Sequence, residues 1–242
     1  MNTLLFNDIP LAKAEGLVVF LVFSTAFIVI GILAYYFSRK QRIIRALKKF
    51  KTNRITQFRT NELTKITGKV LHVHEPLVAP YSKRKCVAYH IRIEHRRSTG
   101  KSSHWKTLVS EHDIQDFFIE HRGEVVMIKP TKYPKNYKSY MVSDRTVNSG
   151  TFNDPTPEFE RLLKHYTINS ETILGFNKRL RYTERIIEVG EVITVGGIAK
   201  WKELSEPITE YGSTRIATLE SDHEHKLIIT DEPSAKTLER RL

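Results

Sequence analysis

The feature that most constrains this chain is an apolar stretch near its N-terminus. Residues 16–37 run for 22 positions without a charge, a proline or an amide side chain. As a helix rising about 1.5 Å per residue, the stretch would reach roughly 33 Å, against a hydrocarbon thickness of about 30 Å. It closes on Tyr35, Tyr36 and Phe37, aromatic residues of the kind favoured at the headgroup level. The sequence therefore predicts a transmembrane helix over residues 16–37.

A cleaved secretory signal is the alternative interpretation of this stretch. Such a signal has a cationic segment before a shorter apolar core. Here the stretch is preceded by Asp8, Lys13 and Glu15, which are not a cationic segment. We therefore expect an uncleaved anchor that follows a short extracytoplasmic N-terminus, residues 1–15.

The charges on either side of the stretch predict its orientation. Residues 39–54 hold eight Lys or Arg side chains and no acid, whereas the first 38 residues sum to minus one. By the positive-inside rule the N-terminus lies outside and everything after Phe37 is cytoplasmic. The single cysteine agrees, because secreted domains of this size often carry paired cysteines. The prediction is a single-pass membrane protein with a cytoplasmic C-terminal domain.

Residues 38–61 form a predicted basic juxtamembrane segment. Each cation near an anionic leaflet contributes about 1 kcal/mol, so lipid headgroups are the expected partner, with a plain topology signal as the alternative. Ile43, Ile44, Leu47 and Phe50 recur at helical spacing, which predicts an amphipathic extension along the membrane interface. The candidate membrane-surface residues are Arg39, Lys40, Arg42, Arg45, Lys48, Lys49, Lys51 and Arg54.

The formal net charge of +12 could suggest a nucleic-acid partner. Most of the excess lies in residues 39–54, however, and the rest of the chain after that segment holds 30 basic against 25 acidic side chains. A domain this mildly basic lacks the concentrated positive charge that binds phosphate backbones. We therefore expect no nucleic-acid partner.

Residues 62–233 are predicted to form a mainly β domain, barrel- or sandwich-like with helical additions, before a C-terminal tail at residues 234–242. The clearest strand is Cys86–Arg96, where apolar and polar residues alternate. Asp116–Pro130 is typical of a hairpin with Gly123 in its turn. Other expected strands are Lys65–Val73, Tyr140–Val142, Arg179–Ile187, Glu191–Val195, Thr214–Leu219 and Lys226–Thr230.

Three local signals refine this prediction. Thr156 and Pro157 begin a helix with a capping hydroxyl and a proline at its first position. Gly68 inside its strand indicates a bulge or a close backbone approach. Gly196 and Gly197 are expected to punctuate the end of a strand.

Metal chemistry has little support in the sequence. A structural zinc site needs four Cys or His ligands at close spacing, which one cysteine among scattered histidines does not supply. His72 with His74, or His223 with His225, leaves a paired-histidine site as an alternative. The sequence predicts no metal and no cofactor.

Two residues invite a catalytic interpretation. Cys86 follows Lys83, Arg84 and Lys85, and nearby cations lower a thiol pKa, so a reactive cysteine stands as an alternative to a packed one. Glu184 shares the apolar face of its strand, where a carboxylate must find donors. We expect Glu184 to be a buried hydrogen-bond acceptor, and no catalytic residue is predicted.

An ordered set of motifs resembles the GIDE domain, also called the BAM ("beside a membrane") domain. Its opening is similar to Gly68-Lys69-Val70, to residues 75–82 and to residues 84 and 86–89 of this chain. Its later landmarks are similar to Trp105, the hairpin at residues 116–130, Glu184, Gly190, Val192, Val195, Gly196 and the ending Thr230-Asp231-Glu232-Pro233. The resemblance covers roughly residues 62–233.

The resemblance implies a mostly β module beside a membrane helix. The best-known members of the family are mitochondrial E3 ubiquitin ligases with a second transmembrane helix and a RING finger. This sequence holds neither a second apolar span nor the Cys and His set of a RING, so ligase chemistry is not carried over. We expect a non-enzymatic domain that binds a small molecule or a protein.

Two other functions stay open at this point. One is a component of an E3 ubiquitin ligase, and the other is a hydrolase or redox enzyme that uses Cys86. The binding surface that we expect is the long loop before Cys86, because such loops suit contact better than a core. The candidate ligand- or partner-binding residues are Pro80, Ser82, Lys83, Arg84, Lys85, Cys86 and Trp105.

Overall fold

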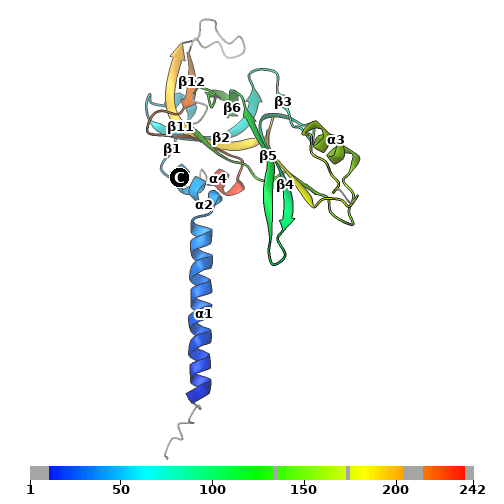
Figure 1. The fold of residues 1–242 in the computed structure, drawn as a ribbon. Coiled ribbons are helices and arrows are strands. Elements are labelled where there is room, and N and C mark those ends of the chain that lie inside the picture. The colour runs from blue at the N-terminus through cyan, green and yellow to red at the C-terminus, as the bar shows by residue number, and fades with distance from the viewer. Residues whose placement is uncertain (1–10, 133–135, 173–174, 204–214, 238–242) are drawn as a thin grey trace, which may run out of the picture. The chain divides into compact units, whose positions relative to one another are not determined.

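The computed structural model describes residues 11–132, 136–172, 175–203 and 215–237 (Figure 1). The chain divides into two compact units, residues 1–42 and residues 43–242. The prediction for Thr214 at the start of a strand lies outside the described residues.

The first unit is built on helix α1 (Leu11–Tyr36). Its segment Val18–Tyr36 is long and apolar enough to cross a membrane, and none of that segment is buried. The helix confirms the predicted apolar helix, although it begins before Gly16 and ends before Phe37. At Phe37 and Ser38 the backbone turns before helix α2 (Arg39–Leu47) begins.

The apolar side of the basic segment lies elsewhere than expected. Ile43, Leu47 and Phe50 pack with Ile228 and Ala235 in a small hydrophobic cluster of the second unit. Leu47 is fully buried there. These apolar side chains are covered by protein, so the interpretation of an amphipathic segment resting on the membrane is wrong for them. Their burial removes the same apolar surface from water that lipid would have covered.

Thirteen strands and three further short helical segments are described in the second unit beside the end of α2. The strands are β1 (Lys51–Thr52), β2 (Leu63–His72), β3 (Leu77–Val78), β4 (Lys85–Ser98), β5 (Ser103–Ile114), β6 (Phe117–His121), β7 (Glu124–Ile128), β8 (Tyr137–Tyr140), β9 (Arg145–Asn148), β10 (Leu180–Glu188), β11 (Val192–Glu203), β12 (Arg215–Glu220) and β13 (Leu227–Thr230). The helical segments are η1 (Ile55–Gln57), α3 (Pro157–His165) and α4 (Pro233–Lys236).

Five strands close into a ring. In order they are β2, β6, β7, β12 and β11, and β11 pairs back with β2 to complete it. Four of the five pairings are antiparallel, and β7 with β12 is parallel. Inward side chains such as Ile119, Val126, Val195 and Leu219 are buried in the main core. The predicted barrel-like β fold is confirmed.

A second sheet holds β3, β4, β10 and β9 in that order, and β5 pairs with β4 along the same edge as β3, further along the strand. Helix α3 covers one face, where Phe159, Leu162 and Leu163 pack with Ile91 and Tyr182. Thr156 caps the helix by accepting a hydrogen bond from the Phe159 backbone N–H, as predicted from the Thr-Pro pair. Figure 1 shows the long β4–β5 hairpin extending past its neighbours.

The glycines explain two features of the ring. A Cβ at Gly68 would lie 2.3 Å from the Glu120 carbonyl oxygen, which confirms the predicted close backbone approach. Gly196 lies inside β11 instead of ending it, so the predicted strand Glu191–Val195 was too short. A Cβ there would lie 2.9 Å from Leu47 Cδ2, so the glycine makes room for α2. The predicted strand Tyr140–Val142 has the wrong bounds, because the observed strand β8 spans Tyr137–Tyr140.

Candidate functional site

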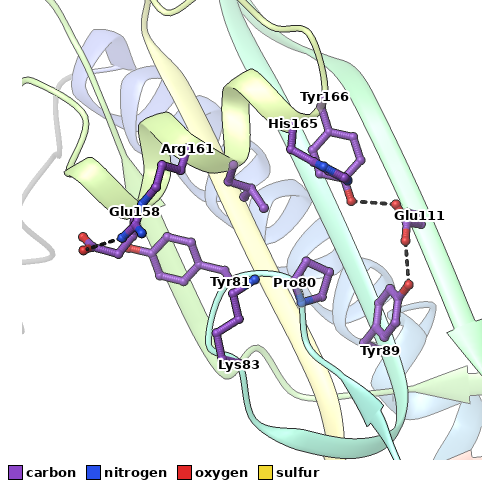
Figure 2. A pocket seen from close by; sticks show the side chains of 10 residues that line it. Pro80, Tyr81, Lys83, Tyr89, Glu111, Glu158, Arg161, His165 and Tyr166 are labelled. Carbon is purple, nitrogen blue, oxygen red and sulfur yellow. Dashed lines mark hydrogen bonds and ion pairs between the residues drawn. The ribbon is translucent and has the colours of Figure 1, made fainter.

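The loop after β3, the β4–β5 pair and helix α3 together enclose a cavity of about 540 Å³ (Figure 2). Its volume falls in the usual range for small-molecule sites. The lining residues are Pro80, Tyr81, Lys83, Tyr89, Glu111, Glu158, Arg161, Leu162, His165 and Tyr166. The cavity thus combines aromatic walls with several charged groups.

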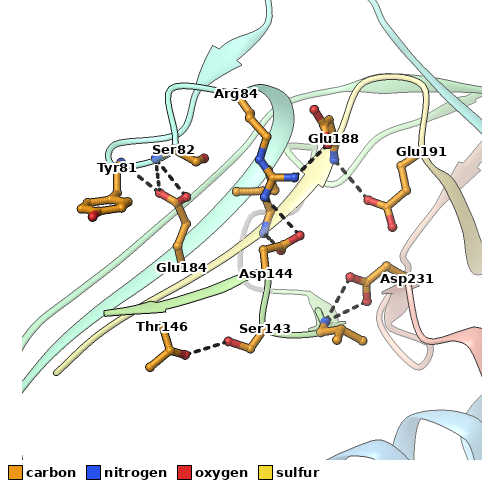
Figure 3. A network of polar contacts seen from close by, with 12 residues as sticks. Tyr81, Ser82, Arg84, Ser143, Asp144, Thr146, Glu184, Glu188, Glu191 and Asp231 are labelled. Atoms are coloured by element: carbon orange, nitrogen blue, oxygen red, sulfur yellow. Dashed lines mark hydrogen bonds and ion pairs between the residues drawn. The ribbon is translucent and has the colours of Figure 1, made fainter. Parts of the chain in front are cut away.

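The loop that forms one wall is held by a buried carboxylate. Glu184 on β10 is fully buried and accepts hydrogen bonds from the backbone N–H groups of Tyr81, at 2.9 Å, and Ser82, at 3.1 Å (Figure 3). The Tyr182 hydroxyl donates a third bond to it at 2.8 Å. Burial and this carboxylate raise the pKa of Tyr182. The prediction that Glu184 is a buried acceptor is confirmed.

A second carboxylate links strand β4 to the residue that follows helix α3. Glu111 on β5 accepts a 2.6 Å hydrogen bond from the Tyr89 hydroxyl and another 2.6 Å bond from the Tyr166 hydroxyl (Figure 2). The bonds from Tyr166 and Tyr89 lower the pKa of Glu111, so it is ionised at neutral pH. Burial, followed by the bond to Glu111, raises the pKa of both tyrosines. The result is a negative charge fixed in the cavity wall.

Charged side chains of both signs surround the opening. Arg161 and Glu158 on α3 form an ion pair at 3.2 Å. Lys83 sits in the loop with a φ of 60°, in the left-handed region. The His165 ring packs edge-on against the Tyr166 ring, with 4.9 Å between the two ring centroids.

The structure separates the predicted basic triplet. Lys83 and Pro80 line the cavity. Arg84 instead forms ion pairs with Asp144, at 3.3 Å, and Glu188, at 3.0 Å (Figure 3). Lys85 is exposed at the start of β4. The three cations therefore do not form one contact patch.

Ser82 and Trp105 also take up different positions. The Ser82 backbone N–H binds Glu184, and its Oγ is buried without a hydrogen-bond partner among the described residues. Trp105 lies on β5 and lines another hollow, in which neither Pro80 nor Lys83 takes part. The cavity thus unites only part of the predicted set.

Cys86 is fully buried and has the environment of a packed thiol. Its Sγ donates to the Leu77 carbonyl oxygen at 3.6 Å. Burial, with a further contribution from the charge of Glu184, raises the thiol pKa to about 12. The expectation that the neighbouring cations lower this pKa is wrong, because Arg84 offsets only part of the burial effect. Cys86 is a protonated thiol at neutral pH.

One histidine of each predicted pair contacts a neighbouring group of the protein. His72 Nδ1 lies 3.0 Å from the His74 carbonyl oxygen, and His225 interacts with Asp222. No group of three or more metal-ligating side chains gathers among the described residues.

Sequence reasoning missed most of the cavity wall. Glu111 lies on β5, a strand exposed on both faces that carries no alternating pattern. From the sequence, Tyr89 is placed in the predicted strand Cys86–Arg96, and neither tyrosine is given a role in a site. The signal that could have found them is the polar hydroxyl on each, because a partly buried tyrosine usually needs a hydrogen-bond partner.

Comparisons with protein-family models, with curated proteins and with solved structures find no match to this chain. The resemblance of residues 62–233 to the GIDE domain therefore stays a prediction.

Proposed function

We propose that this chain is a single-pass membrane protein whose β domain binds a small molecule or a protein partner on the cytoplasmic side. The observation that carries the proposal is the exposed apolar surface of α1. Side chains such as Phe20, Phe27 and Ile30 are each more than half exposed. An apolar surface of that extent is unstable in water and is stabilised by lipid.

The charge distribution supports the proposed orientation. Arg39, Arg42, Lys48, Lys49 and Arg54 are exposed, as cations that meet anionic headgroups would be. Lys51 is exposed too, although it pairs with Glu62 at 2.6 Å, and Lys40 and Arg45 are half-buried. The positive-inside rule then assigns the domain to the cytoplasm.

The cavity beside α3 is the proposed binding site. It offers aromatic surface from Tyr81, Tyr89 and Tyr166 together with the fixed charge of Glu111. Apolar walls with a few placed polar groups are typical of ligand sites. The resemblance to the GIDE domain, which implies a module beside a membrane, agrees with a binding role and extends over the same residues.

The anchor is tested with the full-length chain expressed in cells. Alkaline carbonate treatment should leave the protein in the membrane fraction, and protease added outside intact cells should not cut the C-terminal domain. Recovery in the soluble fraction, or cleavage of the domain from outside, would contradict the proposal.

The site is tested by placing a photo-crosslinking amino acid at Arg161, on the cavity rim. The matched control carries the same amino acid at Lys106, an exposed position on β5 that does not line the cavity. We expect a crosslinked partner from position 161 and none from position 106. Equal capture from both positions would show that the cavity does not define the site.

A further inference from the structure

The second sheet carries an unusual concentration of arginine on the face turned away from α3. Side chains alternate between the two faces of a strand. On β4 and β10 the side chains of Ile91, Ile93 and Tyr182 face the core beneath α3. The intervening positions carry arginines, and the register pairs Arg181 with Glu94. We name this surface the arginine face: Arg92, Arg96, Arg179, Arg181 and Arg185, with Glu94 as the acid among them.

Two adjoining hollows lie over the arginine face. The larger has a volume of about 490 Å³ and is lined by Arg96, Arg179 and Arg181, by Trp105 and by polar groups of β9 and the loop after it. The smaller, of about 240 Å³, is lined by Arg92, Arg181 and Arg185 with hydroxyl groups around them. Both include Arg181 and Thr146, so they are contiguous.

The centre of the face is rigidly held. Arg181 donates from Nε and Nη2 to Glu94 Oε2, at 3.0 and 2.7 Å. Its guanidinium lies 4.2 Å from the centroid of the Trp105 ring. A guanidinium that donates two hydrogen bonds to one carboxylate oxygen and lies over an aromatic ring is fixed in place before any ligand arrives.

The surrounding arginines retain donors that the protein does not use. Arg179 is exposed, and its guanidinium forms no hydrogen bond or ion pair within the described residues. Arg92 Nε is buried and has no acceptor in the described part of the chain. Among the residues that the structure describes, the Arg96 guanidinium binds only the Ser103 hydroxyl, at 2.9 and 3.2 Å. Arg92 Nη1 also lies 3.9 Å from Glu94 Oε1, so within the described residues the unfilled donors around the two hollows are those of Arg179 and the Nε of Arg92.

We propose that the arginine face binds a phosphate-bearing small molecule. A phosphate group brings nearly two negative charges and three strong acceptor oxygens, which match several converging forks better than a carboxylate does. The cations lining the two hollows are all arginines, the side chain that recognises phosphate in a bidentate manner. This site lies on the other face of the sheet from the cavity beside α3, and it does not depend on the function proposed for that cavity.

A nucleic acid fits the face less well. Single-stranded nucleic acids stack successive bases on several aromatic side chains. Among the described residues Trp105 is the one aromatic side chain of the larger hollow, the smaller hollow has none, and Arg181 already covers one face of the Trp105 ring. The proposal is therefore a compact ligand held by charge-assisted hydrogen bonds.

The test titrates inorganic pyrophosphate into the full-length protein in detergent and measures binding by calorimetry. Arg179→Gln and Arg96→Gln should each raise the Kd about tenfold or more, since each removes a hydrogen bond between charged groups. Arg97→Gln is the matched control, because Arg97 is the exposed neighbour of Arg96 on β4 and does not line either hollow. The Kd of this control should stay within about twofold of the wild-type value. Thermal midpoints check that every variant is folded.

A second arm uses short-chain phosphatidylinositol 4,5-bisphosphate to identify the source of the phosphate. Binding of this lipid that falls with Arg179→Gln supports the proposal and assigns the phosphate to a headgroup. Binding of pyrophosphate alone supports it and assigns the phosphate to a free molecule. Equal losses in Arg97→Gln and Arg179→Gln, or no saturable binding of either probe, would overturn the proposal. So would tight binding of single-stranded RNA that pyrophosphate does not displace.

Discussion

The Glu184 carboxylate on β10 accepts a hydrogen bond from the backbone N–H of Tyr81, 103 positions earlier in the chain, at 2.9 Å. With the bond from Ser82, this contact fixes the loop wall of the cavity to the centre of the second sheet. The three donors around the buried Glu184 carboxylate depend on its charge. Loss of that charge weakens all three hydrogen bonds and leaves buried donors poorly satisfied.

Glu184→Gln should therefore destabilise the domain by about 2 kcal/mol, since it weakens hydrogen bonds to a buried charged group. Urea unfolding followed by tryptophan fluorescence measures the change. Glu188→Gln is the control, because Glu188 is partly exposed and its ion pair with Arg84 should contribute less than about 1 kcal/mol. Equal losses in the two variants would contradict the role assigned to Glu184.

Leu47→Ala should destabilise the second unit by about 2–5 kcal/mol, because it removes a fully buried side chain that packs over Gly196. Lys48→Ala, at the exposed neighbouring position, should change stability by less than about 0.5 kcal/mol. Chemical unfolding of the protein in detergent measures both. A neutral Leu47→Ala would mean that this end of α2 is not part of the core.

Glu191→Gln should flatten the pH dependence of stability between pH 5 and 8. Burial raises the pKa of Glu191 to about 7, so the folded state holds its proton more tightly than the unfolded chain does. The contribution of Glu191 to the free energy of unfolding is greatest below the pKa that it has in the unfolded chain. This contribution is lost as the pH rises through the folded-state pKa of about 7. The variant should gain stability relative to wild type at pH 8 and show little difference at pH 5.

The matched measurement for that prediction is Asp231→Asn. Burial raises the pKa of Asp231 to about 6, so the same loss of stability should occur about one unit lower. His95 and His112 act in the opposite direction, because burial lowers the pKa of each. Comparing each variant with wild type at the same pH removes the histidine contribution. A Glu191→Gln curve parallel to wild type would contradict the assignment.

Cys86 should resist maleimide at pH 7.5 in the native protein, because the buried thiol has a pKa of about 12 and little thiolate is present. Modification should be at least about a hundredfold slower than in urea-unfolded protein, since burial and thiol protonation both protect the group. Mass spectrometry over a time course measures the two rates. Rapid native labelling would revive a cysteine-based chemistry.

The clearest patterns in the sequence predicted their elements correctly. Alternation identified β4, the Thr156-Pro157 pair identified α3, and Gly123, at a φ of 81°, lies in the β6–β7 turn. Each of these signals is local, because a few adjacent residues carry both the propensity and the burial pattern.

The elements that were missed depend on distant partners. Strand β5 is exposed on most of its length, so its pairing with β4 leaves no hydrophobic period. Gly196 and Gly197 look like turn residues, yet they allow the close approach of Leu47 and Leu227 inside β11. The site depends on distant contacts even more, because Glu111 accepts hydrogen bonds from two tyrosine hydroxyls that lie 22 and 55 positions away in the sequence.

Closure of the five-stranded ring also sets an order of events during synthesis. Its last joins are those of β12, which pair Val126 with Ala217 and Ala199 with Leu219, so the ring cannot close before β12 has been made. Until then β2, β6 and β7 can pair with one another, but the edges of β7 and β11 that face β12 lack their partner in the ring. Unpaired strand edges of this kind can pair with other chains, and synthesis of β12 removes that exposure by closing the ring.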